Sequence, residues 1–290
     1  MRKTLVIFLL TVSIISKPLP SLAISDREAL ARRICYPYEQ CFIVCDDGTV
    51  FMDAATKEEY PEVSGWTDVI AISAYSHGAV AGLRKNGTVL CAGANLCDEE
   101  RQRVANWTHI VQVFVTGYTI YGVDETGVLH SAAEKVSAWQ ENIQWENVRS
   151  VGGKLYTYVI TQDGHVLTDA PVNLEELEHV IQIADSTVDV SFLLEDGSIV
   201  EYALDIAYWY PQIWDQAVQI TYDDNQFAAL SAAGTIQSSE ISHYHDAALE
   251  NIVAISGGVA VDREGNLHFT REIETDEEIP AFNLEGYHFD

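Results

Sequence analysis

Residues Trp66-Thr67-Asp68-Val69-Ile70-Ala71-Ile72 and Asn86-Gly87-Thr88-Val89 decide the fold of this protein. The first stretch places a large apolar residue before two polar residues and a short apolar run, which predicts one strand with a bulky anchor. The second stretch is an Asn-Gly turn signal beside β-prone residues. It predicts a tight hairpin, because both central positions adopt positive φ at low cost. Together they predict one small antiparallel unit.

The hairpin signal recurs along the chain. Seven turn glycines are separated by 31 to 40 residues, and they are Gly48, Gly87, Gly127, Gly164, Gly197, Gly234 and Gly265. The strand signal precedes six of them and begins at Trp66, Trp107, Trp145, Leu177, Trp214 and Leu249. This repetition indicates an array built from one supersecondary unit.

A unit this short cannot bury its own apolar face, whereas neighbouring units packed side by side can. All-strand repeats of about 30 to 40 residues close radially into a propeller more readily than they stack into a solenoid. We therefore expect an all-β, seven-bladed β-propeller over residues 35–290, with the Trp and Leu anchors in the core between blades.

The first hairpin, residues 41–52, lacks the anchored strand upstream. A C-terminal strand within residues 279–289, with Phe282 at the anchor position, would complete that blade. Pairing of the N- and C-terminal segments would close the ring and remove its exposed sheet edges.

The repeat resembles that of the regulator-of-chromosome-condensation (RCC-type) propeller family, and most of all the exported bacterial branch of that family. The resemblance covers residues 35–270. The second unit carries it most fully, at Trp66, His77, Leu83, Asn86, Gly87, Thr88, Val89 and Gly93. Other units are degenerate, since Leu177 and Leu249 replace the Trp anchor.

The resemblance implies the fold more than the function, because members of one fold do different things. The nucleotide-exchange activity known for the family belongs to a nuclear protein and is not expected for an exported chain. Exported members that resemble this chain include β-lactamase-inhibitory propellers, which bind a protein partner over one face. No contact residue can be matched to them.

Residues 1–23 have the order of a secretory signal. Arg2 and Lys3 form a basic start, an apolar run extends over residues 5–15, and small residues lead to a cleavage site after Ala23. An uncleaved anchor helix is the alternative, but the apolar run is short of the roughly 20 residues that cross a bilayer. We expect a secreted or cell-surface protein with a short leader at 24–34, not membrane-bound after cleavage.

The chain is strongly acidic. It has 16 Lys plus Arg and 44 Asp plus Glu, and removal of the signal, with its three basic residues, takes the net charge from −28 to −31. A field of this sign repels phosphate backbones and anionic headgroups, so nucleic acid is not an expected partner. Five cysteines leave at least one unpaired, and Cys91 with Cys97 is a possible disulfide.

Nothing in the sequence reads as a catalytic centre. The acidic clusters lie in connections between units, no nucleophile or phosphate-loop motif occurs, and no cofactor or metal is expected. The most unusual segment is a loop at 205–211 with Tyr208, Trp209 and Tyr210, and Trp139 is a second aromatic residue outside the repeat. Packing beneath a loop is one interpretation, and binding is the other.

We therefore expect a non-enzymatic, monomeric binding protein that engages a protein or glycan partner through loops on one face. The alternative is a polysaccharide-acting hydrolase or lyase with carboxylates near the propeller axis. That enzyme would show two or three titratable residues from different blades at an axial pocket.

Overall fold

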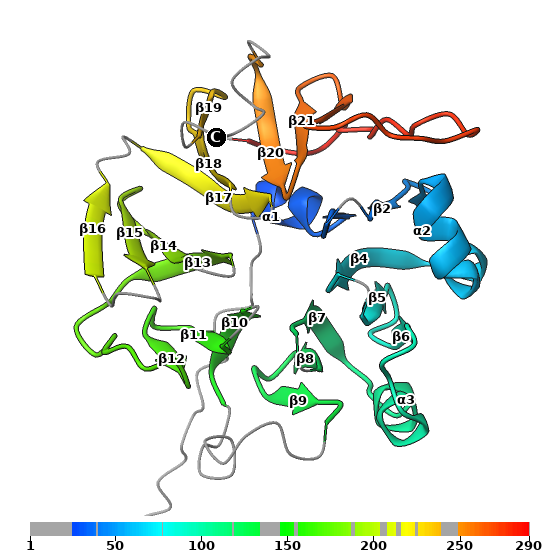
Figure 1. Cartoon of the computed structure of the whole chain (residues 1–290), viewed down its shortest axis with the longest axis horizontal. Coiled ribbons are helices and arrows are strands. Elements are labelled where there is room, and N and C mark those ends of the chain that lie inside the picture. Colours follow the sequence, from blue (N-terminus) through cyan, green and yellow to red (C-terminus); the bar gives the residue numbers. More distant parts are fainter. Residues whose placement is uncertain are drawn as a thin grey trace, which may run out of the picture.

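The computed structural model describes residues 25–289 apart from 39, 77, 118, 134–145, 154–155, 187–188, 204–207, 213–215, 224–225 and 239–248. Its strands form seven antiparallel sheets arranged radially around an axis (Figure 1). In the described residues, six sheets have three strands and one has four. This is the all-β, seven-bladed propeller that the repeat predicts.

Each blade is one sheet, and its first strand lies nearest the axis (Figure 1). Blade 1 consists of β1 (Ile34–Cys35), β2 (Phe42–Val44) and β3 (Val50–Met52), blade 2 of β4 (Val69–Ala74), β5 (Val80–Arg84) and β6 (Val89–Ala92), and blade 3 of β7 (Ile110–Val115), β8 (Ile120–Asp124) and β9 (Leu129–Ser131). Blade 4 consists of β10 (Val148–Gly152), β11 (Tyr158–Thr161) and β12 (Val166–Thr168).

Blade 5 has the fourth strand, and it consists of β13 (Val180–Asp185), β14 (Asp189–Leu194), β15 (Ile199–Ala203) and β16 (Tyr208–Gln212). Blade 6 consists of β17 (Ala217–Asp223), β18 (Gln226–Ser231) and β19 (Ile236–Ser238), and blade 7 of β20 (Ile252–Ser256), β21 (Val259–Asp262) and β22 (Leu267–Phe269). The helices are α1 (Asp26–Ala31), α2 (Ala54–Glu59), α3 (Asp98–Ala105) and the 3-10 helix η1 (Pro61–Gly65).

The inner strands of blades 2 to 7 begin in the same way. The residue before each strand has φ between 58° and 64°, and these residues are Asp68, His109, Asn147, His179, Gln216 and Asn251. Left-handed backbone is uncommon outside glycine, and Asp, Asn and His tolerate it better than other residues. This requirement explains the second polar position of the repeat. A β-bulge then follows the first residue of each of these strands.

The turn glycines join each blade to the next. All seven have φ between 76° and 87°. The carbonyl oxygen of Gly48 accepts a hydrogen bond from the backbone N–H of Val69, the first residue of the next inner strand, over 3.0 Å. A Cβ atom on Gly48 would lie 3.0 Å from the Cα of Asp68. Glycine is thus needed both for the turn and for close approach to the neighbouring blade.

The tryptophan anchors pack in the core between blades, as the sequence predicts for Trp66 and Trp107. Both are buried. Trp107 packs against Ala81 and Leu83 of blade 2 as well as against its own blade. Trp145 and Trp214 lie outside the described residues.

The two ends of the chain meet at blade 1, but the predicted closing strand is wrong. Residues 279–289, all of which the structure describes, contain no strand. The inner strand is instead the N-terminal β1, which begins at Ile34, the last residue of the segment expected to be a leader. Phe282 takes the role of only the first residue of an inner strand. Its backbone N–H donates to the carbonyl oxygen of Gly265, as the N–H of Val69 donates to that of Gly48. β1 thus takes the position beside β2 that the C-terminal strand was expected to occupy.

The predicted signal at 1–23 lies outside the described residues. Within the described part of the chain, no helix is long and apolar enough to span a membrane.

Candidate functional site

Helix α1 sits in the central channel of the ring (Figure 1). Ser25 caps it, because the Ser25 hydroxyl accepts a hydrogen bond from the backbone N–H of Glu28 over 3.2 Å. Leu30 is fully buried against residues of blades 1 and 7, including Val253. The Arg27 guanidinium donates to the carbonyl oxygen of Val253. The helix is therefore a packed part of the propeller.

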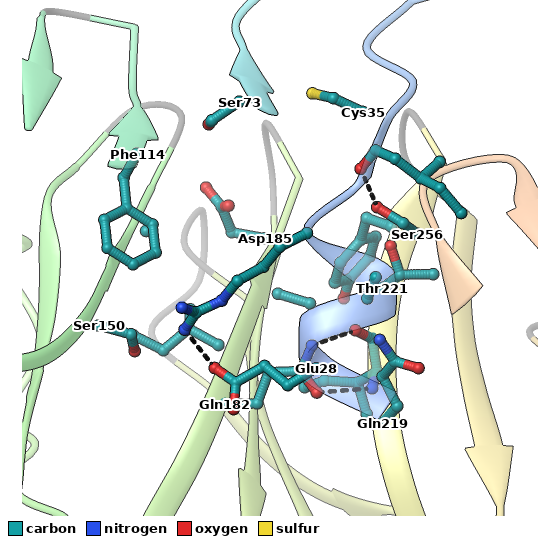
Figure 2. Close-up of a pocket in the computed structure, with 18 of the residues that line it drawn as sticks. Glu28, Cys35, Ser73, Phe114, Ser150, Gln182, Asp185, Gln219, Thr221 and Ser256 are labelled. Carbon is teal, nitrogen blue, oxygen red and sulfur yellow. Dashed lines mark hydrogen bonds and ion pairs between the residues drawn. The ribbon is translucent and has the colours of Figure 1, made fainter. Parts of the chain in front are cut away.

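A cavity of about 420 Å³ lies between α1 and the inner strands. Its walls come from α1, β1 and the inner strands of the other six blades (Figure 2). This volume falls in the range of small-molecule sites in proteins. The channel cavity, as we call this space, is the candidate site.

Most polar side chains on the wall hold neighbouring inner strands together. The Gln182 side chain accepts from the N–H of Ile220 over 2.9 Å and donates to the carbonyl oxygen of the same residue over 2.8 Å. The Gln219 side chain likewise accepts from the N–H of Ile255 over 2.9 Å. These contacts join blade 5 to blade 6 and blade 6 to blade 7 (Figure 2).

Shorter side chains also form hydrogen bonds between neighbouring inner strands elsewhere around the ring. The Cys35 sulfur accepts from the N–H of Ala74 over 3.1 Å, and the Ser73 hydroxyl accepts from the N–H of Val115 over 2.9 Å. Between blades 3 and 4 the pattern fails. There the carbonyl oxygen of the buried Gln112 side chain has no hydrogen-bond partner among the described residues.

The charged residues of the channel cavity are Arg27, Arg32, Arg149, Glu28 and Asp185. Glu28 and Arg32 form an ion pair, and the Arg32 guanidinium lies over the ring of Phe114, 6.0 Å from its centroid. Burial lowers the pKa of Arg32, and the like charge of Arg149 lowers it further, although Glu28 opposes both. The Arg32 guanidinium nevertheless stays charged at neutral pH, because arginine is not deprotonated in proteins.

The enzymatic alternative expects carboxylates from different blades near the axis, and the described residues of the cavity provide two carboxylates. Among the described residues that line the cavity, only Glu28 and Asp185 are carboxylates, and Glu28 is held by Arg32. Asp185 alone comes from a blade (Figure 2). Within the described part of the chain, no group of three potential metal ligands occurs either.

Comparison with known proteins gives structural neighbours only, since no family model and no curated protein matches the sequence. Yeast RCC1 (Prp20), in a structure bound to Kap60, has a TM-score of 0.52 at 13% identity, with 97% of this chain and 92% of that chain covered. The chain has the fold of an RCC1-type β-propeller. The resemblance predicted from the repeat is thus confirmed for the fold.

Two plant receptor ectodomains are also similar in structure. The CRINKLY WD40 ectodomain of Arabidopsis thaliana ACR4 has a TM-score of 0.52 at 13% identity, covering 82% of this chain and 92% of that chain. The ectodomain of the Physcomitrella patens receptor kinase CR4 has a TM-score of 0.54 at 10% identity, covering 72% and 65%. Identities this low establish the fold alone.

In this propeller, the aromatic residues predicted to bind lie far from the channel cavity. Tyr208, Trp209 and Tyr210 do not form a loop, because they are in β16, paired with β15 through contacts such as Trp209 with Tyr202. β16 is the outermost strand of blade 5, at the periphery of the ring (Figure 1). Trp139 lies outside the described residues.

The possible disulfide between Cys91 and Cys97 is not formed in the structure, where none of the five cysteines is in a disulfide. Cys91 lies in β6 and is partly buried, and Cys97 is exposed as the N-cap residue of α3.

Sequence reasoning missed the channel residues. Arg149 follows Val148 where Ile70 follows Val69 in the second unit, so an alignment of the repeats could have shown it.

Proposed function

We propose that this protein is a non-enzymatic, exported binding protein that engages a protein partner at the periphery of blade 5. The observation that carries the proposal is β16, because no other sheet in the described part of the ring has a fourth strand. Tyr208, Trp209 and Tyr210 are consecutive residues of this strand. Aromatic residues of this kind are enriched at the centres of protein interfaces.

The position of β16 suits strand-to-strand recognition. It pairs with β15 over five residues, and no described strand pairs with its other edge. A free edge presents a row of backbone donors and acceptors to an incoming segment. Pro211 opposes Val200 in this strand, and proline is tolerated in sheets mainly at such edges.

The structural neighbours support a binding role for the fold. One of them is described as bound to Kap60, and two others are receptor ectodomains. The signal-like residues 1–23 support export, and the net charge of −28 supports solubility without a nucleic-acid partner. Among the described residues of the channel cavity, Asp185 is the one carboxylate that a blade contributes, and this supports binding over glycan hydrolysis.

The test is capture of a partner by the purified mature protein and by a Tyr208→Ala, Trp209→Ala, Tyr210→Ala variant. Culture supernatant and extracts of neighbouring cell surfaces serve as sources, and each captured protein is then purified and titrated against both forms. We expect the triple variant to lose its partner while its thermal unfolding midpoint changes little, since β16 is outermost.

Matched controls remove exposed apolar side chains elsewhere. Ile70, which is 47% exposed, and Ile279, which is 37% exposed, are changed singly to Ala. Both controls should bind the partner as the unmodified protein does. Retention of every partner by a folded triple variant contradicts the proposed site, and size-exclusion chromatography checks the expected monomer.

A further inference from the structure

Each inner strand of blades 2 to 7 contains one bulge residue. In blades 2 to 7 each is skipped by the strand pairing, and they are Ile70, Val111, Arg149, Ile181, Val218 and Val253. In blade 1, Ile34 opposes Ile43 as Ile72 opposes Gly82 in blade 2. Two residues before Ile34 stands Arg32, and two residues before Ile72 stands Ile70. Arg32 therefore occupies in blade 1 the position that Ile70 occupies in blade 2. This position is therefore aliphatic in five blades and arginine in two.

The two arginines reach the same space. Arg32 and Arg149 both line the channel cavity, although blades 1 and 4 stand on different sides of the axis (Figure 1). Their charges are close enough for Arg149 to lower the pKa of Arg32. Two guanidinium groups that share a cavity repel each other unless an anion lies between them.

The available carboxylates do not balance these charges. Arg32 is paired with Glu28 through Nη2, but its buried Nη1 has no hydrogen-bond partner among the described residues. Arg149 is partly buried and makes no hydrogen bond or ion pair within the described part of the chain. An unsatisfied buried donor in a native protein calls for an ordered water or a bound ion.

The other charged residues that the described part of the chain places in the cavity are Arg27 and Asp185. Arg27 donates to the carbonyl oxygen of Val253 and lies over the ring of Phe289, 5.9 Å from its centroid. Asp185 lies on the wall formed by β13. Among the described residues, the cavity therefore has three arginines against two carboxylates, in a chain whose net charge is −28. The charge balance of the described cavity residues is thus opposite in sign to the net charge of the chain.

We propose that the channel cavity binds the carboxylate of a small organic ligand between Arg32 and Arg149. Guanidinium groups bind carboxylates through paired hydrogen bonds, so the guanidinium of Arg149 and the unpartnered Nη1 of Arg32 suit this group. The ring of Phe114 offers an apolar surface beside it (Figure 2). A volume of about 420 Å³ admits a ligand of the size of a sugar acid.

This site is separate from the proposed partner surface, because β16 is the outermost strand of blade 5 and lies at the periphery of the ring (Figure 1). Failure of one proposal therefore leaves the other standing.

The test is isothermal titration of the mature protein with D-galacturonate at low salt, with D-galactose as the neutral match. We expect saturable binding of galacturonate and none of galactose. An N-acetylated Gly-Asp-Gly amide peptide, with its Gly-Asn-Gly counterpart, forms the second arm. Binding of galacturonate alone assigns the site to free acids, whereas binding of the Asp peptide assigns it to an acidic residue. Both results support carboxylate recognition.

Arg149→Gln is the decisive variant. We expect it to weaken binding about tenfold or more, because it removes the charged, bidentate donor. Arg149→Lys should retain part of the affinity. Without ligand, Arg149→Gln should unfold at the same temperature or higher, since it relieves repulsion with Arg32, and this result separates lost binding from lost folding.

Lys85→Gln is the matched control, because it removes the same charge from an exposed turn of blade 2. Its affinity should equal that of the unmodified protein. Equal binding of galacturonate and galactose, absence of binding by every carboxylate probe, or unchanged affinity of Arg149→Gln would overturn the proposal.

Discussion

The backbone N–H of Phe282 donates to the carbonyl oxygen of Gly265 over 2.9 Å, and this bond couples the C-terminal segment to blade 7. It repeats the bond from Val69 to Gly48 that joins blades 1 and 2. The ring of Phe282 is buried, and the Arg33 guanidinium lies 4.2 Å from its centroid. Phe282 thus connects the last blade to the segment that leads into the first.

Gly265→Ala tests this connection. Gly265 has φ +87°, and a Cβ atom there would lie 2.0 Å from the carbonyl oxygen of Phe282. The substitution combines left-handed strain with a backbone clash, so we expect the free energy of unfolding to fall by about 3 kcal/mol in urea denaturation.

Gly286→Ala is the control for Gly265→Ala. Gly286 has φ +90° but no atom within 4 Å of a Cβ, so only the conformational cost of about 1 kcal/mol should appear. Equal losses in the two variants would show that the contact with Phe282 contributes nothing to closure.

Truncation after Thr270 removes the whole C-terminal connection. It deletes Phe282, the bond from the Asn283 N–H to Asp46 and the bond from the His288 N–H to Asp26. We expect the truncated protein to lose its cooperative unfolding transition, because the C-terminal aromatic residues, Phe282 among them, leave the apolar cluster that joins blade 7 to blade 1. An unchanged midpoint by circular dichroism contradicts this view of closure.

Gly82→Ala tests the packing of the tryptophan anchor. A Cβ atom on Gly82 would lie 2.7 Å from the Trp66 ring, whereas one on Gly152 would lie 3.7 Å from Ile183, an ordinary contact. We expect Gly82→Ala to cost about 1 to 3 kcal/mol and Gly152→Ala to cost less. Trp66→Leu added to Gly82→Ala should recover part of the loss in denaturant titrations. Without any recovery, the clash would lie elsewhere.

The fold was predictable because its requirements are local. A turn glycine such as Gly87 and a left-handed polar residue such as Asp68 are each demanded by backbone geometry, and the repetition of both marks the blades. The anchors were predictable for the same reason, since Trp66 and Trp107 stand at fixed distances before those residues.

The closure and the site depend on contacts that no local pattern records. β1 is two residues long and lacks the anchored start, because Phe282 supplies the bond that begins the other inner strands. The sequence predicts a loop where β16 lies, because Pro211 and the aromatic run depart from the repeat, yet pairing with β15 makes it a strand. Arg32 and Arg149 line the same cavity because the closed ring brings blades 1 and 4 to one axis.

Gln219→Leu tests the polar contacts that join inner strands. The Gln219 side chain is 4% exposed, and its loss leaves the buried N–H of Ile255 without its acceptor. We expect a loss of about 1 to 3 kcal/mol in the free energy of unfolding. Gln112→Leu is the match, at 2% exposure, because the Gln112 carbonyl oxygen has no partner among the described residues. It should cost clearly less, and equal losses would refute the role given to Gln219.

Stability at low pH should depend on Asp262. Its carboxylate accepts hydrogen bonds from the His268 ring over 2.9 Å and from the Asn266 N–H over 2.9 Å. Burial opposes ionisation and is the largest influence, but the combined hydrogen bonds outweigh it and lower the pKa of Asp262. The unfolded chain has the ordinary Asp pKa of about 3.9.

Because the folded pKa lies below the unfolded one, Asp262 contributes stability above pH of about 4 that is lost as the pH falls through the folded value. We expect Asp262→Asn to be less stable than the unmodified protein at pH 6, with the gap shrinking as urea titrations move toward pH 3. Asp276→Asn, at an exposed carboxylate without a hydrogen bond in the described part of the chain, should show a smaller gap at pH 6. A gap for Asp262→Asn that is constant with pH means that its contacts do not favour the ionised carboxylate.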